Sequence, residues 1–226
     1  MREVISRGTQ NENLKRSSLI YKKTIRTYDL KKNPSISKTT GDPDKNIKPY
    51  DVKIYQITNN PKGKAPERLI EEDGMKKNQI EDSGLDIADL YSEIPKRYRF
   101  YLQGQEVIND RAYYIIRFES RFLRDKNTNI SDDDIIEKGM NRMEGTMHID
   151  VKDFYLSELD GIMVSGFRKF LVINAHGFSI KVWQEVFSGI AVVHKIQVDK
   201  NYSVFGVDSY YRSIYEYSDY KDLRQP

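Results

Sequence analysis

The sequence contains no cysteine among its 226 residues. This absence excludes disulfide bonds, thiol nucleophiles and cysteine-ligated metal sites. Histidine is scarce, with three residues, and no apolar run approaches the ~20 residues that a membrane-spanning helix needs. The net charge of +3 is too small to indicate a nucleic-acid partner. We therefore expect a globular chain that does not cross a membrane by itself.

No apolar segment follows Met1, so the sequence as given shows no export leader. Such a chain is either cytoplasmic or a mature form whose leader has been removed. The charge is uneven, because residues 1–50 hold 12 Lys or Arg against 5 Asp or Glu. This basic end could meet an acidic partner or anionic lipid, although such segments are more often solvated faces.

Aromatic residues make up 12% of the chain, and 16 of them are tyrosine, which favours strands. Apolar residues alternate at period two in several segments bounded by turn-forming residues. We expect strands at the following ranges: 18–29, 50–58, 65–71, 98–108, 111–121, 145–151, 155–160, 164–174, 179–186, 190–198 and 203–217. We expect turns at Asp73-Gly74, Asn109-Asp110, Asp160-Gly161, His176-Gly177, Ser188-Gly189 and Asp199-Lys200-Asn201.

Two segments favour helices instead. Residues 1–17 form a weakly amphipathic N-terminal helix or arm, and residues 75–94 show apolar spacing closer to helical until Pro95. Strands without interleaved helices indicate an antiparallel meander, and an open sheet of this size curls. The predicted fold is α+β, mainly β, with about ten strands in a curled half-barrel covered by these one or two helices. No linker divides the chain, so we expect one domain over residues 1–226.

Four sequence motifs resemble a known family. Residues 100–118 are similar to a G-x-E-x-(V/I)-N-G-R hairpin pattern, with Asp110 in place of the usual glycine. Residues 68–74, 144–150 and 215–220 are similar to further turn and strand motifs, with His148 where tryptophan is common. The chain thereby resembles the outer-membrane lipoprotein-sorting family, the half-barrel of the carrier LolA and the regulator RseB. Every one of these motifs is structural, marking turns and pleats.

The resemblance implies export to the periplasm, or association with the outer membrane, and a concave apolar face. That face would bind lipid, lipoprotein acyl chains or an apolar protein segment, and peripheral contact with a membrane fits this role. The ligand-lining candidates are Tyr101, Tyr113, Ile115, Trp183 and, from the predicted covering helix, Leu90. Ordinary core packing and cross-strand pairing is the commoner role of such residues.

Catalytic patterns are weak. The sequence has no Gly-x-Ser-x-Gly elbow and no glycine-rich phosphate loop. The carboxylates of Glu144, Asp150, Glu158 and Asp160 could pair for acid–base work, but in strand-turn-strand segments they more often face water. We expect no enzyme activity and no cofactor.

Metal-binding patterns are equally weak. His148, His176 and His194 fall on different predicted elements, and residues 132–134 form an acidic run without the rest of a calcium loop. We therefore expect no metal site. The expected protein is a monomeric carrier or sensor. The alternatives are an envelope interaction module with a filled interior, acting through an edge strand or the basic N-terminus, and a hydrolase of unrecognised type.

Overall fold

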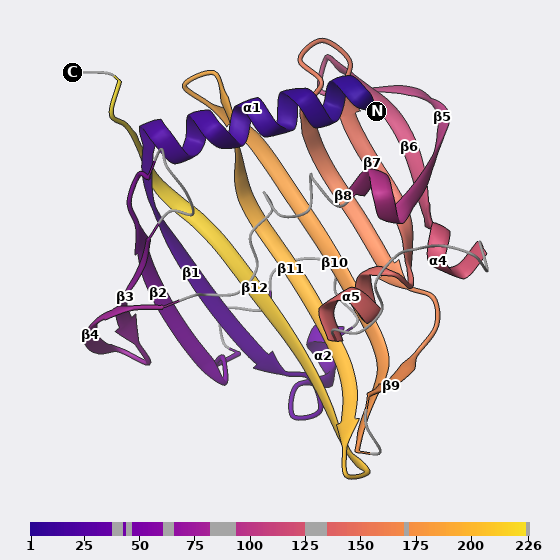
Figure 1. Cartoon of the computed structure of the whole chain (residues 1–226). Coiled ribbons are helices and arrows are strands. Elements are labelled where there is room, and N and C mark those ends of the chain that lie inside the picture. Colours follow the sequence, from indigo (N-terminus) through magenta and orange to yellow (C-terminus); the bar gives the residue numbers. More distant parts are fainter. Residues whose placement is uncertain are drawn as a thin grey trace.

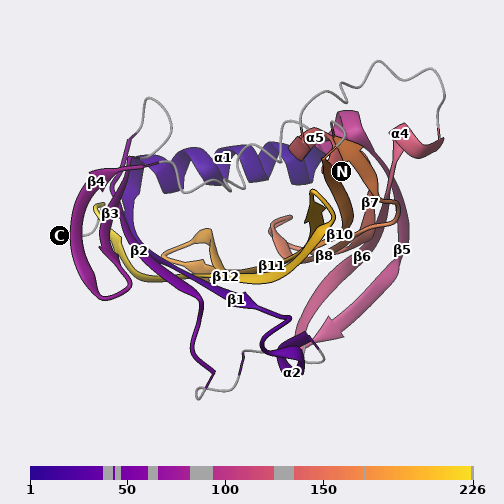
Figure 2. The ribbon, with the colours of Figure 1, turned by 90° about the horizontal axis from the view of Figure 1, so that it is seen from below.

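The computed structural model describes residues 1–37, 43, 47–60, 66–81, 94–124, 135–169 and 172–224. One 12-stranded antiparallel sheet dominates them, in the order β4-β3-β2-β1-β12-β11-β10-β8-β7-β6-β5, with β9 paired to β10. The sheet curls into an open half-barrel, and helix α1 lies across its concave side (Figures 1 and 2). The predicted α+β, mainly β half-barrel is therefore confirmed.

The elements follow the chain in a simple order. The helices are α1 (Arg2–Ser18), α2 (Pro34–Ser37), α4 (Arg121–Arg124) and α5 (Ile135–Met140). The first strands are β1 (Leu19–Asp29), β2 (Asp51–Ile57), β3 (Glu67–Glu72), β4 (Met75–Ile80), β5 (Tyr98–Ile108) and β6 (Arg111–Ser120). The remaining strands are β7 (Met143–Asp150), β8 (Leu156–Met163), β9 (Phe167–Lys169), β10 (Ile173–Phe187), β11 (Ile190–Val204) and β12 (Val207–Asp222).

Two meanders meet where β1 pairs with β12. One runs from β1 to β4, and the other runs from β5 to β12. Strands β4 and β5 follow each other in the chain but lie at opposite edges of the sheet. The sheet therefore stays open. Separately, none of the described helices is long and apolar enough to cross a membrane.

Tight two-residue turns join several strand pairs. Asn109 and Asp110 both have positive φ values, 49° and 63°, so Asp110 adopts the conformation that glycine usually supplies. Asp73-Gly74, Ser188-Gly189 and Phe205-Gly206 have the same pair of positive φ values. This geometry matches the right-handed twist of antiparallel strands. The turns that the sequence predicted at 73–74, 109–110 and 188–189 are confirmed.

The helix predicted over residues 75–94 is wrong in its first part. Met75–Ile80 forms β4, because the Asp73-Gly74 turn folds this segment back onto β3. Lys76 and Lys77 then reach Glu71 and Glu72 of β3 at 3.0 and 3.3 Å. Residues 82–93 of the predicted helix, including Leu90, lie outside the described residues. The N-terminal helix predicted over 1–17 corresponds to α1.

Three predicted turns lie inside strands instead. Asp160-Gly161 belongs to β8 and His176-Gly177 to β10, while Asp199-Lys200-Asn201 continues β11. The β11–β12 hairpin turns later, at Phe205-Gly206, because Asp199 pairs across the strands with Arg212 at 2.7 Å. The strand predicted over 164–174 is also divided between β9 and the start of β10.

Candidate functional site on the concave face

Helix α1 covers the concave face through a narrow, mostly polar stripe. Its buried residues are Val4, Gly8, Glu12, Lys15 and Ser18, spaced so that they share one side of the helix. Asn11 fixes the helix to the sheet, because its side chain donates to the Ala191 carbonyl oxygen at 2.5 Å. The oxygen of the Asn11 side-chain amide accepts a hydrogen bond from the Ala191 backbone N–H at 2.7 Å. Since few apolar contacts are made by α1, the face beneath it must supply its own core.

A continuous apolar row crosses the concave face. Its members are opposite one another in the strand register, which places their side chains on the same side of the sheet. The row runs Ile25, Tyr215, Ile196, Val182, Leu159, Met147, Ile116 and Leu102, from β1 to β5. All but the edge residue Leu102 are buried in the main hydrophobic cluster, which also contains Val4 of α1.

Beside this row, two glycines leave room for an aromatic ring against the sheet. Gly145 and Gly161 lie opposite each other on β7 and β8, and the Phe118 ring packs over them. A Cβ atom on Gly145 would lie 2.0 Å from the Asp160 carbonyl oxygen and 2.8 Å from Phe118 Cζ. The glycines therefore let the aromatic ring sit close to the backbone.

A polar row lies next to the apolar row, on the side nearer α1. Lys23 is two residues before Ile25 on β1, and its cross-strand neighbours are Tyr55 and Tyr217. The Lys23 ammonium is only 2% exposed and lies 2.9 Å from each carboxylate oxygen of Glu67. It also lies 5.6 Å from the centre of the Tyr55 ring. An ion pair is thus built into the wall of an apolar face.

A buried amide extends this polar row toward the middle of the sheet. Gln184 lies two residues after Val182 on β10, opposite Val193 of the main cluster. Its residue exposure is 9%, and both polar atoms of its side chain lack a hydrogen-bond partner in the described part of the chain. Buried amides are normally satisfied, and leaving one unpaired costs about 1–3 kcal/mol.

The concave face keeps some apolar surface exposed. Several apolar side chains pack on the main cluster yet keep accessible surface: Met1, Tyr21, Ile94, Phe100, Tyr114, Phe154, Phe178 and Tyr217. Burial raises the pKa of the half-buried Tyr217 hydroxyl well above its ordinary value.

Two buried tyrosine hydroxyls of this face have raised pKa values. Burial raises the pKa of Tyr98, whose hydroxyl donates to the Met140 carbonyl oxygen at 2.7 Å. Burial, reinforced by the Glu81 carboxylate, also raises the pKa of Tyr55. The Tyr55 hydroxyl donates to that carboxylate at 3.2 Å. These side chains act as neutral hydrogen-bonding groups rather than as bases.

The predicted ligand-lining residues lie on the other face. Tyr113 and Ile115 alternate with Tyr114, Ile116 and Phe118, which pack on the concave cluster. Tyr101 likewise neighbours the concave Phe100, and its hydroxyl donates to Glu119 at 2.7 Å. Trp183 follows the concave Val182 and lies 5.4 Å from the Lys195 ammonium. These four side chains therefore do not lie on the concave face, and their role in ligand binding stays a prediction.

The error lies in the phase of the alternation. Lys181 and Glu185 flank Trp183 at period two, and Arg117 shares its face with Tyr113 and Ile115. Charged residues at these positions mark the solvent side of a strand. Reading the faces from Lys and Arg rather than from the aromatic residues would have selected Tyr114, Ile116 and Val182.

The carboxylates predicted for acid–base work do not converge. Asp150 contacts Arg111 at 3.0 Å, and Asp160 contacts Lys181 at 2.7 Å. Glu158 lies 3.9 Å from His148, and Glu144 lies 3.5 Å from Arg117. Each of these four acids therefore has a basic side chain as its neighbour on the convex face.

The three histidines are equally dispersed. They lie on β7, β10 and β11, and within the described ranges no group of three or more His, Cys, Asp or Glu side chains could hold a metal ion. The acidic run 132–134 lies outside the described residues.

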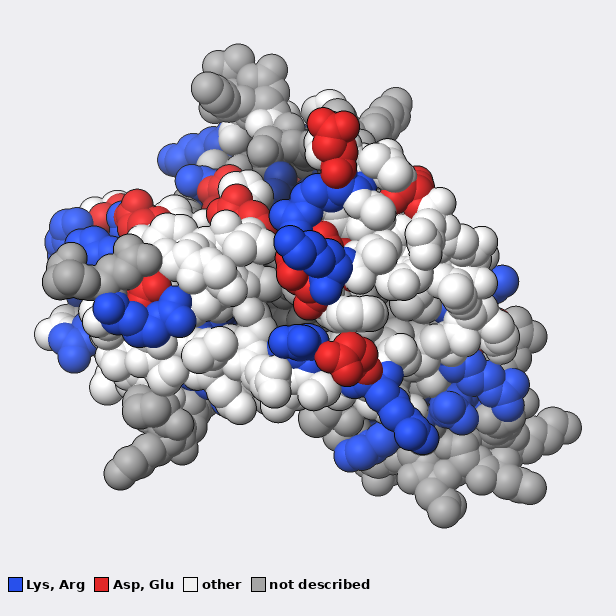
Figure 3. Space-filling model, turned by 90° about the horizontal axis from the view of Figure 1, so that it is seen from above, with Lys and Arg blue, Asp and Glu red and all other residues white. Residues whose placement is uncertain are grey.

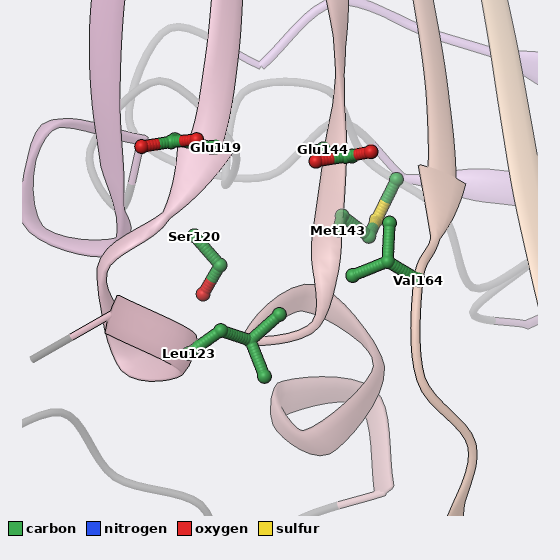
Figure 4. Close-up of a pocket in the computed structure, with 6 residues that line it drawn as sticks. All are labelled: Glu119, Ser120, Leu123, Met143, Glu144 and Val164. Carbon is green, nitrogen blue, oxygen red and sulfur yellow. The ribbon is translucent and has the colours of Figure 1, made fainter. Parts of the chain in front are cut away.

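A separate small pocket lies where β6 and β8 end and β7 begins (Figure 4). Its volume is about 290 Å³, at the lower limit for a small-molecule site. The lining residues are Glu119, Ser120, Leu123, Met143, Glu144 and Val164. Glu119 and Glu144 are opposite in register, and Arg117 lies 3.8 and 3.5 Å from them. The two carboxylates thus share one guanidinium, which accounts for their proximity.

Comparison with known proteins identifies relatives only among solved structures. No family model and no curated protein matches the chain. A LolA superfamily protein from Nitrosomonas europaea is 12% identical, with a TM-score of 0.40 over 97% of this chain and 92% of that one. A domain assigned to outer-membrane lipoprotein sorting from Vibrio parahaemolyticus is 8% identical, with a TM-score of 0.39 over 98% and 93%.

The complex of MucA and MucB from Pseudomonas aeruginosa also matches, at 10% identity and a TM-score of 0.25 over 96% of this chain and 94% of that one. The first two of these structures carry names from the lipoprotein-sorting family that the sequence motifs resemble. All three have TM-scores of 0.40 or lower.

Proposed function

We propose that the protein is a non-enzymatic binding protein of the bacterial envelope, exported to the periplasm, that holds lipid or acyl chains on its concave face. The observation that carries this proposal is the continuous apolar row from Ile25 to Leu102, lined by side chains that keep accessible surface. A typical ligand site is concave and mostly apolar, with a few polar groups. The curved sheet under α1 has this composition.

A binding role is favoured over catalysis by the distribution of charged groups. Asp150, Asp160 and Glu144 on the convex face each contact an Arg or Lys side chain, and burial raises the pKa of Tyr98 on the concave face. A hydrolase would need converging acids or histidines with pKa values displaced toward neutrality. The concave face instead supplies surface for hydrophobic contact.

Displacement of a fluorescent fatty acid from delipidated protein tests the proposal. Phe100 and Tyr101 provide a matched pair of variants, because they are neighbours on edge strand β5 but face opposite sides of the sheet. We expect Phe100→Asn to weaken binding about tenfold and Tyr101→Asn to leave it unchanged, since only Phe100 borders the concave cluster. Equal loss in both variants, or no saturable binding to the unmodified protein, would contradict the proposal.

The edge strand β5 supports a second candidate function, as a docking site for a partner strand. Among the described strands, β5 pairs only with β6 and stands at one edge of the sheet. Leu102, Val107 and Ile108 on it are 66%, 71% and 43% exposed. Exposed apolar edges recruit further strands.

Photocrosslinking in cells tests this second function. A photoreactive residue at position 107 on β5 should crosslink to one envelope protein, whereas the same residue at Lys22 on β1, in the middle of the sheet, should not. Identical crosslinks from both positions would contradict a specific role of the edge.

A further inference from the structure

The space between α1 and the sheet changes polarity from one end to the other. Helix α1 begins near β7 and β8 and leads directly into β1 (Figures 1 and 2). Met1 and Val4, at its start, join the apolar cluster. Glu12 and Lys15, near its end, form a buried ion pair at 2.6 Å. The buried side of the helix is therefore apolar near β7 and β8 and carries an ion pair toward β1.

The sheet beneath changes in the same direction. Beneath the start of α1, strands β6 to β8 present apolar side chains, which are Ile116, Met147, Ile149, Leu156 and Leu159. Near the other end lies the polar row of Gln184, Tyr217, Lys23, Tyr55 and Glu67. Helix α1 and the sheet beneath it thus become more polar in the same direction. Packing of the helix on the sheet does not by itself require this match.

From this gradient we propose that the ligand is an amphiphile bound in one orientation, resting on the lipid-binding function proposed above. Its polar end lies beside Lys23, Glu67 and Gln184, and its hydrocarbon end lies over Met147, Ile149 and Leu156. Because Lys23 and Glu67 neutralise each other, the row as a whole offers hydrogen bonds without net charge. The head group that fits is uncharged or zwitterionic.

The stability of the fold does not explain the polar row. A buried ion pair is often no more stabilising than well-packed apolar residues of similar volume, because both charges lose their hydration. The neighbours Ile25, Ile57 and Leu69 on the same strands and face are apolar and buried. The unpaired amide of Gln184 adds a further cost that a ligand's polar group would remove.

The side chains of this row supply both hydrogen-bond donors and acceptors. Glu67 offers carboxylate oxygens and is 12% exposed, six times the fraction of Lys23 at 2%. The Tyr217 hydroxyl can donate or accept, and the Gln184 amide can do both. The nearby Tyr21 ring, 6.0 Å from that of Tyr217, adds a second amphipathic side chain beside the polar row.

Paramagnetic broadening of methyl signals tests the orientation. The probes are phosphatidylcholines that carry a nitroxide near the head group or near the chain end. Leu69 and Ile57 report on the polar end, and Met147 and Leu156 report on the apolar end. We expect the head-group label to broaden the first pair and the chain-end label to broaden the second.

The possible outcomes separate the two proposals. A reversed pattern, or the same pattern from both labels, overturns the orientation while leaving lipid binding intact. No broadening from either label, together with no displacement of the fluorescent fatty acid, overturns the proposed function itself.

A double variant tests the role of the ion pair directly. Lys23→Met with Glu67→Leu keeps the volume and removes the charges, so we expect a folded protein whose affinity for phosphatidylcholine falls about tenfold. Its affinity for a pyrene-labelled hydrocarbon should be unchanged. Unchanged affinity for phosphatidylcholine would overturn the proposal.

The matched control lies on the opposite face. Lys181 and Asp160 form a cross-strand ion pair of 2.7 Å on β10 and β8, where Lys181 alternates with the concave Ile180 and Val182. Lys181→Met with Asp160→Leu should leave the affinities for both probes unchanged. An equal loss in the control would show that removing any ion pair from the sheet has the same effect.

Discussion

The two faces of the same strands differ in the side-chain contacts that they make. On the concave face a row of apolar residues from Ile25 to Met147 is buried without the help of a strongly apolar helix. On the convex face the register instead pairs charges, such as Lys181 with Asp160 and Arg212 with Asp199. Figure 3 looks onto the end of the molecule that α1 crosses, where Lys and Arg side chains lie beside Asp and Glu. The concave face is therefore mainly apolar, whereas the convex face combines paired charges with a small apolar cluster of Tyr28, Leu30 and Ile214.

The largest effect should come from filling the hollow under Phe118. Gly145→Val would place a side chain against the Asp160 carbonyl oxygen, where even a Cβ atom would lie at 2.0 Å. We expect a loss of about 4 kcal/mol in unfolding free energy, or failure to fold. Urea denaturation followed by circular dichroism measures it. Gly139→Ala is the control, because a Cβ there meets nothing within 4 Å and should be neutral or slightly stabilising.

A smaller effect should follow from emptying the concave core. Ile196 is fully buried in the apolar row, so Ile196→Ala should cost about 3 kcal/mol through lost burial and a residual cavity. Ile162, which is 55% exposed, provides the comparison, and Ile162→Ala should cost at most about 0.5 kcal/mol. Similar values for the two variants would contradict the assignment of the faces.

The convex face should be sensitive where its charges are shielded. Arg212 and Asp199 are 4% and 16% exposed and make two contacts of 2.7 Å, so Asp199→Asn should cost about 2 kcal/mol. Arg26 and Glu216 pair on the same face but are 38% and 39% exposed. Glu216→Gln should therefore cost at most about 1 kcal/mol. Equal effects in thermal unfolding would argue against burial as the cause.

The weakest effect is a dependence of stability on alkaline pH. Burial raises the pKa of Tyr98 in the folded state above its ordinary value of 10.0. The folded protein therefore holds the phenolic proton more tightly than the unfolded chain, and this stabilisation is lost as pH rises above that value. Tyr98→Phe should flatten the alkaline decline, at a cost near neutral pH of about 1 kcal/mol for the lost hydrogen bond. Urea midpoints across this pH range measure both.

Local chemistry made part of the fold predictable. Asn109 and Asp110 tolerate positive φ values, and the alternation of 111–118 is pronounced, so the β5–β6 hairpin follows from adjacent residues. The segment 75–80 was wrongly predicted to be helical, because its strand is stabilised by pairing with β3 rather than by its own pattern. Gly161 was likewise read as a turn residue, although it lies in a strand to accommodate the distant Phe118.

The concave face was only partly predictable. A curled sheet with an apolar face was expected from composition and from the number of strands. Which aromatic residues face inward depends on the phase of each strand, and Tyr101, Tyr113, Ile115 and Trp183 lie on the convex side. The pairing of Lys23 with Glu67 joins strands that are not neighbours in the sheet. No sequence pattern marks a contact of this kind.

The sequence by itself determined that the chain forms strands, where several of them turn, and that their alternation gives one apolar face. These features depend on backbone preferences and side-chain periodicity within a few residues of each other. Tertiary structure decided that β1 pairs with β12, that β4 and β5 become opposite edges, and that ionic and apolar groups lie at different ends of the space under α1. Those outcomes depend on contacts between residues far apart in the chain, whose free energy appears only when the whole sheet has formed.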